Sequence, residues 1–153
     1  MFAPLAQLAE QGPFKPKVWS SSLQGSTIVG IMTNLTFGLI ILSYIFILHF
    51  IGDFGLQSRW MAENKSKNYK ALLAHGLVYT LFLSFMMGLP FGYAGILYGL
   101  FNGVIHTMID AISSRLSSAA WRSGKIGRFW KIIGADQCIH QVVLIMSMGV
   151  FLI

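Results

Sequence analysis

The stretch IVGIMTNLTFGLIILSYIFILHF, residues 28–50, decides the fold class of this chain. It carries no lysine, arginine, aspartate or glutamate, and it exceeds the roughly 20 apolar residues that a helix needs to cross a bilayer. Ser26 and Thr27 stand directly before it and can cap a helix. We therefore expect a membrane-spanning helix that starts here and continues through Asp53 to about Met61.

Three more apolar segments follow, joined by short connections. They are ALLAHGLVYTLFLSFMMGL (71–89), ILYGLFNGVIHTMIDAISSRL (96–116) and IIGADQCIHQVVLIMSMGVFLI (132–153). Gly88, Pro90 and Gly92 mark a turn between the first two of these segments. Helices joined by short loops pack as antiparallel neighbours. The sequence thus predicts an all-α fold, an integral membrane antiparallel bundle of four transmembrane helices over residues 26–153.

The overall composition supports a membrane protein. The chain is 55% hydrophobic and 10% charged, whereas a soluble domain carries roughly 25% charged residues. Its net charge of +6 could indicate nucleic-acid binding or basic loops on the cytoplasmic side of a membrane. The apolar composition favours the basic loops, so we expect the lipid bilayer as a partner and no specific nucleic acid.

Residues 1–25 differ from the rest of the chain. Glu10 interrupts the apolar run that a signal peptide needs, and Lys15 and Lys17 follow the apolar stretch instead of preceding it. We expect this segment to be an N-terminal interfacial or flexible arm.

Lysine and arginine predict the orientation. They flank the first and third connections between apolar segments, and the second connection has none. The basic positions are Arg59, Lys65, Lys67, Lys70, Arg115, Arg122, Lys125, Arg128 and Lys131. Because cytoplasmic loops are enriched in these residues, both connections are predicted to face the cytoplasm.

Histidine and aspartate follow an unusual pattern in the apolar segments. Three of the five acidic residues lie four positions from a histidine, and the fourth histidine also lies in an apolar segment. The pairs are His49 with Asp53, His106 with Asp110, and Asp136 with His140; the remaining histidine is His75. This spacing places both side chains of a pair on one helix face. On the predicted topology, all seven residues lie at a similar depth, toward the basic connections.

Ionisable groups inside membrane helices are costly, and they are normally buried, paired and functional. Imidazole and carboxylate together bind zinc, manganese or iron. The predicted metal ligands are His49, Asp53, His75, His106, Asp110, Asp136 and His140. Seven candidates suit two ions with a bridging carboxylate, or one ion with a general base to spare. Zinc is the first choice of metal, before manganese and iron, and Asp136 is the predicted catalytic base. We expect Gln57, Asn102 and Gln137 to hold hydrogen bonds to the ligands.

Other interpretations of the pattern stay open. A single His–Asp pair on a helix is more often a structural hydrogen bond than a metal ligand, but three pairs at one depth favour a functional site. The preferred function is metal-dependent hydrolysis of a phosphate-containing or lipid-linked substrate, with an anionic lipid or phosphate drawn in by the basic connections. The alternatives are a metal-ion or proton transporter or channel, and a non-catalytic membrane protein with a structural metal. A homodimer is also open, with Gly99 and Gly103 as a GxxxG seam.

Four stretches resemble a known family. They are HFIGDFGLQSRWMAENKS (49–66), LLAHGLVYT (72–80), HTMIDAISSRL (106–116) and DQCIHQ (136–141). They resemble a family of small bacterial and phage membrane proteins of unknown function, which is distantly similar to membrane-bound metal-dependent hydrolases. The resemblance covers about residues 40–153 and implies the same seven ligands. It also implies a place in the bacterial inner membrane. The orientation predicted from lysine and arginine then puts the polar site toward the cytoplasm.

Overall fold

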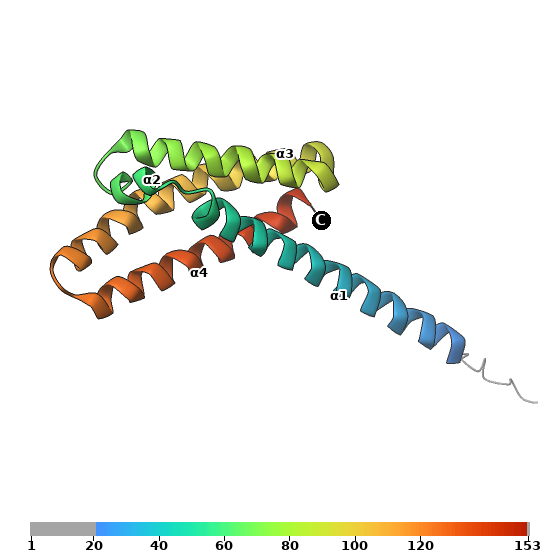
Figure 1. Cartoon of the computed structure of the whole chain (residues 1–153). Coiled ribbons are helices and arrows are strands. Elements are labelled where there is room, and N and C mark those ends of the chain that lie inside the picture. The colour runs from blue at the N-terminus through green and yellow to red at the C-terminus, as the bar shows by residue number, and fades with distance from the viewer. Residues whose placement is uncertain (1–20, 153) are drawn as a thin grey trace, which may run out of the picture. The chain divides into compact units, whose positions relative to one another are not determined.

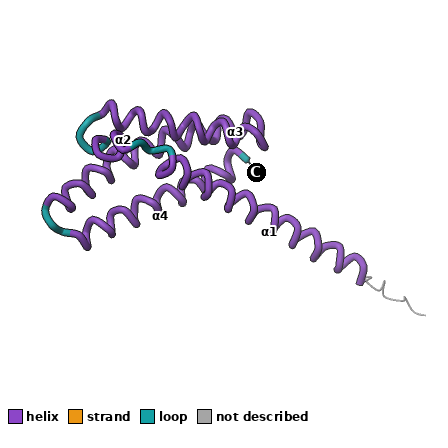
Figure 2. Tube along the Cα trace, in the orientation of Figure 1, coloured by secondary structure: helices purple, strands orange, loops and turns teal. Residues whose placement is uncertain are grey.

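The computed structural model describes residues 21–152, and this range contains helices and no strand (Figures 1 and 2). The elements are α1 (Ser21–Phe50), the π-helix η2 (Ile51–Gly55), α2 (Arg59–Asn64), α3 (Tyr69–Arg122) and α4 (Ile126–Phe151). Three of the helices are long and apolar enough to cross a membrane: α1 with η2, α3 and α4. The all-α prediction is therefore confirmed.

The chain divides into two compact units, residues 1–40 and residues 41–153. In the first unit, residues 1–20 of the expected arm lie outside the described residues, and residues 21–40 are helical. The helix thus starts five residues before the expected cap at Ser26. The second unit contains the buried core and every histidine and aspartate of the predicted site.

The first long helix ends earlier than predicted. It widens into the π-helix η2, whose last hydrogen bond runs from the Leu56 N–H to the Ile51 carbonyl, five residues back. Ser58 is extended, and its hydroxyl accepts a hydrogen bond from the Met61 N–H, so it caps the separate helix α2. The expected continuation to Met61 is therefore wrong, because a new cap at Ser58 competes with extension of the helix.

α3 contains the second and third predicted helices. At 1.5 Å per residue, 54 residues in one straight helix would extend roughly 80 Å, well over twice the thickness of a bilayer core. Instead the chain reverses at Gly92, where φ is 57° and ψ is −136°, a conformation open to glycine (Figure 1). The two arms, residues 69–91 and 93–122, lie side by side and run antiparallel.

Small residues line the seam between these arms. A side chain on Gly103 would collide with Thr80, one on Gly99 with Ser84, and one on Gly95 with the Met87 backbone. Each step of four positions back on the second arm matches three or four positions forward on the first, as antiparallel helices require. Gly99 and Gly103 therefore serve close packing inside the chain, and the homodimer remains an untested prediction.

The interior of the second unit has an apolar core at one end. It is formed by Ile41, Ile45, Leu48, Tyr79, Leu83, Met87, Tyr98 and Leu144. The outer face of the first α3 arm is also apolar, with Leu73, Leu77, Leu81, Phe85 and Leu89 exposed at every fourth position. Helix faces in a soluble protein show the opposite pattern, with polar residues outward.

Candidate metal centre

All seven predicted ligands are buried in one region of the second unit. They come from the end of α1, from η2, from both arms of α3 and from α4. None of the seven is more than 7% exposed: His49, Asp53, His75, His106, Asp110, Asp136 and His140. Two sets of these side chains could each hold a metal ion, and the sets have Asp110 in common.

The first set is Asp53, His75, His106 and Asp110. His75 Nε2 lies 3.1 Å from His106 Nε2 and 3.2 Å from both Asp53 Oδ1 and Asp110 Oδ2. His106 Nε2 lies 3.7 Å and 3.9 Å from the same two oxygens. Ligands about 2.1 Å from a tetrahedral zinc ion are about 3.4 Å from one another. The separations in this set therefore suit a tetrahedral ion at its centre.

The second set is Asp110, Asp136 and His140. His140 Nε2 lies 3.8 Å from Asp110 Oδ1, the oxygen that does not face His75. Within residues 21–152, His140 Nε2 and Asp136 Oδ1 are buried and have no hydrogen-bond partner. Buried polar atoms normally have one, so these two atoms are available for a ligand. Asp110 thus presents one oxygen to each set, as a bridging carboxylate does.

His49 has a different environment from the other predicted ligands. Its Nδ1 lies 2.9 Å from the Tyr79 hydroxyl, and its Nε2 lies 3.3 Å from Gln137 Oε1. It belongs to neither metal-binding set among the described residues. Both ring nitrogens are therefore engaged by protein groups, and the structure brings His49 to the site without placing it in a ligand set.

Gln137 links the ligands to one another. Its amide nitrogen donates to Asp53 Oδ2 at 2.9 Å and to Asp136 Oδ2 at 3.1 Å, while its oxygen faces His49. It therefore holds carboxylates from η2 and α4 together, the role expected of a group next to metal ligands. Asn102, for which the same role was expected, instead bonds Ser147 and the Tyr98 carbonyl.

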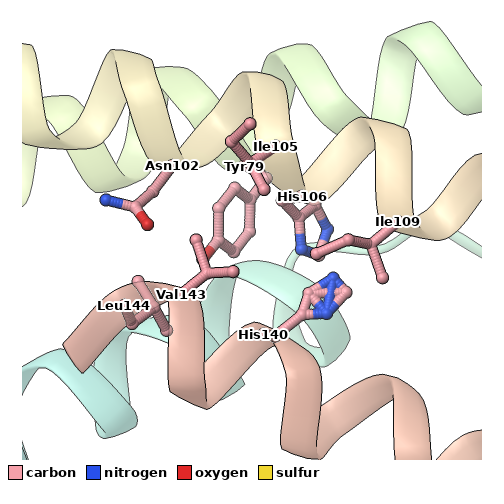
Figure 3. Close-up of a pocket in the computed structure, with 8 residues that line it drawn as sticks. All are labelled: Tyr79, Asn102, Ile105, His106, Ile109, His140, Val143 and Leu144. Carbon is pink, nitrogen blue, oxygen red and sulfur yellow. The ribbon is translucent and has the colours of Figure 1, made fainter. Parts of the chain in front are cut away.

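Gly52 and Tyr79 set the positions of the imidazoles. The Tyr79 ring stacks on the His106 ring, with centroids 3.9 Å apart. A side chain on Gly52 would come within 2.9 Å of the Tyr79 ring, so a glycine in η2 allows this stacking. Figure 3 shows Tyr79, His106 and His140 around a small cavity between α3 and α4. Its volume of about 10 Å³ holds at most one water molecule.

Lys65 also belongs to this site. From the sequence it was predicted only as one of the basic residues in the cytoplasmic connections. Its ammonium lies 2.6 Å from Asp110 Oδ2 and 4.0 Å from Asp53 Oδ1, and its side chain is 18% exposed. Three carboxylates and one ammonium leave two net negative charges at the site when the histidines are neutral. This charge matches one divalent cation, with Lys65 already neutralising the third carboxylate.

A larger cavity opens beside the second set. Its volume is about 200 Å³, and Asp110 and Asp136 form part of its wall. Four serines of α3 also line it: Ser113, Ser114, Ser117 and Ser118. These serines were not predicted from the sequence, although they follow Asp110 at the i+3, i+4, i+7 and i+8 positions of one helix face.

The chain belongs to the family described as "Protein of unknown function (DUF3307)", whose sequence profile matches residues 41–152. The match coincides almost completely with the second compact unit, which contains the whole candidate metal centre. No curated protein and no solved structure is significantly similar to the chain.

Proposed function

We propose that this protein is a membrane-embedded, metal-dependent hydrolase of a phosphate-containing or lipid-linked substrate. One observation carries the proposal: two buried ligand sets share Asp110, and a cavity reaches that residue. Paired metal sites that share a carboxylate are typical of enzymes that cleave phosphate esters. Zinc fits the first set best, because the ligands are two imidazoles and two carboxylates at tetrahedral separations.

The membrane location is supported by the arrangement of polar and apolar side chains. Three helices have the length and composition to cross a bilayer, and the α3 arm at 69–91 has leucines and a phenylalanine on its exposed face. The basic connections lie together, since Lys67 from one and Arg122 from the other line a common cavity. By the positive-inside rule, this side faces the cytoplasm, in a bacterial inner membrane.

In the proposed reaction, a metal ion would be held by the first ligand set, and Asp136, which lies outside that set, is the general base. Its Oδ1 has no partner within residues 21–152, and the residue lines the cavity through which water and substrate would enter. Asp136 takes a proton as the water oxygen forms a bond to phosphorus. The bond from phosphorus to the leaving oxygen breaks, and that oxygen takes up the proton. A bound divalent metal would polarise the phosphoryl group and make the water more acidic.

The apolar core argues against the transporter alternative. A permeation path would need polar groups from one face to the other, but the polar side chains give way to a closed core beyond Asn102 and Ser147. Leu83, Met87 and Tyr98 are fully buried there. Irregular or polar passages at membrane depth occur where they line a water-filled cavity, and the cavity of about 200 Å³ lies at the end with Asp110.

The first test is metal analysis of the detergent-purified full chain, with the His106→Ala variant beside it. We expect one or two equivalents of zinc, manganese or iron in the unaltered protein, and loss of metal in His106→Ala because a ligand of the first set is gone. Met108→Ala is the control, since Met108 lies on the outer face of the same arm and is 60% exposed. Full metal content in His106→Ala would exclude the assigned centre.

Hydrolysis is measured on the same preparations with phosphomonoester and lipid phosphate substrates. Turnover that requires metal and is lost in His106→Ala supports the enzyme. A protein that keeps its metal, turns over no phosphate ester and unfolds on chelation would instead indicate a structural metal.

A further inference from the structure

The cavity beside Asp110 has features of a binding site for an anionic group. It contains about 200 Å³ and is lined on one side by hydroxyls of α3 and on another by the Lys65 side chain. Hydroxyls donate hydrogen bonds to phosphoryl oxygens, and a lysine ammonium supplies the opposite charge. Most ligand pockets for larger molecules begin near 300 Å³, so a small polar group fits this space better.

One serine in this wall lacks the hydrogen bond that its burial requires. Ser114 is 9% exposed, and its hydroxyl has no partner among the described residues. A serine hydroxyl in a helix usually bonds a carbonyl one turn back, as that of Ser147 does to Val143. An unpaired buried hydroxyl is costly, and Ser114 lies in the wall of the cavity, so its hydroxyl is available to a group bound there.

A second cavity continues outward from the first. It contains about 520 Å³, and both cavities are lined by Ala62, Ser66, Ser118 and Phe129. Farther out it is lined by Lys67, Arg122 and Glu63, with Trp121 beside them, so the basic residues outnumber the one carboxylate. The combined space therefore runs from a basic, aromatic entrance at the surface to the carboxylates of the second ligand set.

From this arrangement we infer that the serine-lined cavity, defined by Ser66, Ser113, Ser114, Ser117, Ser118 and Lys65, binds the phosphoryl group of the substrate. The inference rests on the proposed function, since it places the phosphoryl group beside Asp110 and Asp136, where hydrolysis would occur. The outer cavity holds the remainder of the molecule, with its aromatic side chains against the less polar part. The substrate class is thus a phosphate ester, from either a lipid headgroup or a soluble metabolite.

Binding of inorganic phosphate to the detergent-purified full chain, measured by calorimetry, tests the site directly. We expect Ser114→Ala to weaken phosphate binding roughly tenfold, because one hydrogen bond to a charged group is lost. Ser84→Ala is a matched control. Ser84 is 8% exposed and its hydroxyl is also without a partner in the described range, but it lies in the α3 seam and outside this cavity. Ser118→Phe, which fills the junction of the two cavities, should abolish binding.

Metal content is measured on every variant, so that the two proposals fail separately. If Ser114→Ala weakens phosphate binding and leaves the metal content unchanged, the phosphoryl site is supported. If the same weakening is found in a protein that contains no metal, the phosphoryl site is supported and the proposed metal-dependent hydrolysis is rejected. Equal phosphate affinity in the unaltered protein, Ser114→Ala and Ser118→Phe would overturn the inference, even if metal is present. So would an unaltered protein that binds no phosphate.

Two competitors then identify the source of the phosphoryl group. Glycerol phosphate in solution and phosphatidic acid in phosphatidylcholine vesicles each compete with inorganic phosphate if they enter this cavity. Competition by phosphatidic acid alone assigns a lipid headgroup, and equal competition by both assigns soluble esters. Competition by neither contradicts a phosphate-ester site.

Discussion

The two ends of the second unit are built from the same helices but have opposite interiors. At one end, α1, both arms of α3 and α4 enclose Ile45, Leu83, Met87, Tyr98 and Leu144, all fully buried or nearly so. At the other end the same elements, with η2 and Lys65, enclose four histidines and three aspartates. The change occurs along single helices, since Tyr79 contacts both the apolar core and His106.

This difference predicts that stability and metal binding depend on different ends of the unit. Close packing of apolar side chains stabilises a helical interior even in lipid, through dispersion contacts. Buried ionisable groups stabilise a fold weakly and are retained for other reasons. We therefore expect changes at the apolar end to lower the free energy of unfolding without removing metal. Changes at the polar end should remove the metal.

The largest effect is expected for Asp110→Asn. Because Asp110 is the carboxylate shared by both ligand sets, this variant should lose all bound metal and all hydrolytic activity. Elemental analysis of the purified variant checks it. Glu63→Gln is the control, because Glu63 is paired with Arg59 on the surface and should keep full metal content. If the variant loses one metal equivalent and retains another, Asp110 is not a ligand that both sets share.

Leu83→Ala tests the apolar end. Leu83 is completely buried, so its truncation should lower the free energy of unfolding by about 2–5 kcal/mol, through lost contacts and a cavity. Thermal unfolding in detergent measures the change, and metal analysis should show no loss. Leu81→Ala, at a position 59% exposed on the same arm, should have little effect. If Leu83→Ala loses metal at temperatures where the protein is folded, metal binding also depends on the apolar end, and the expected difference between the two ends is wrong.

A smaller effect is expected for Gln137→Leu. This change removes the amide that bonds Asp53 and Asp136, so metal affinity should fall about 10–100-fold. Competition with a metal-binding dye measures the affinity. Gln141→Leu makes the same replacement one turn along α4 at an exposed position and should leave affinity unchanged. Equal affinities in the two variants would show that Gln137 does not orient the ligands.

The smallest effect is expected for Lys65→Met. The ammonium of Lys65 repels an incoming cation from Asp110, so its removal should tighten metal binding by roughly tenfold. The same dye competition measures this, with Lys67→Met as the control because Lys67 is exposed. Weaker metal binding in Lys65→Met would mean that Lys65 holds Asp110 in place instead of competing with the metal.

The sequence by itself determined the helical class and the composition of the polar cluster. Apolar runs such as residues 28–50 exceed the length of a membrane span, and the i,i+4 spacing of His106 with Asp110 places both on one helix face. These features depend on local periodicity, which is visible in a single sequence. For the same reason the reversal near Gly92 was predictable.

Only the tertiary structure decided which of these side chains meet, because contacts between distant segments depend on packing that local periodicity does not specify. The small-residue seam continues at Gly76, where a side chain would collide with Thr107 on the other arm. The seam fixes the register of the two α3 arms, and this register places His75 next to His106. The early end of η2 and the new cap at Ser58 place Lys65 over Asp110, although a continuous helix to Met61 was expected. These long-range contacts decided which polar residues are neighbours, whereas the sequence already showed which polar residues the apolar segments contain.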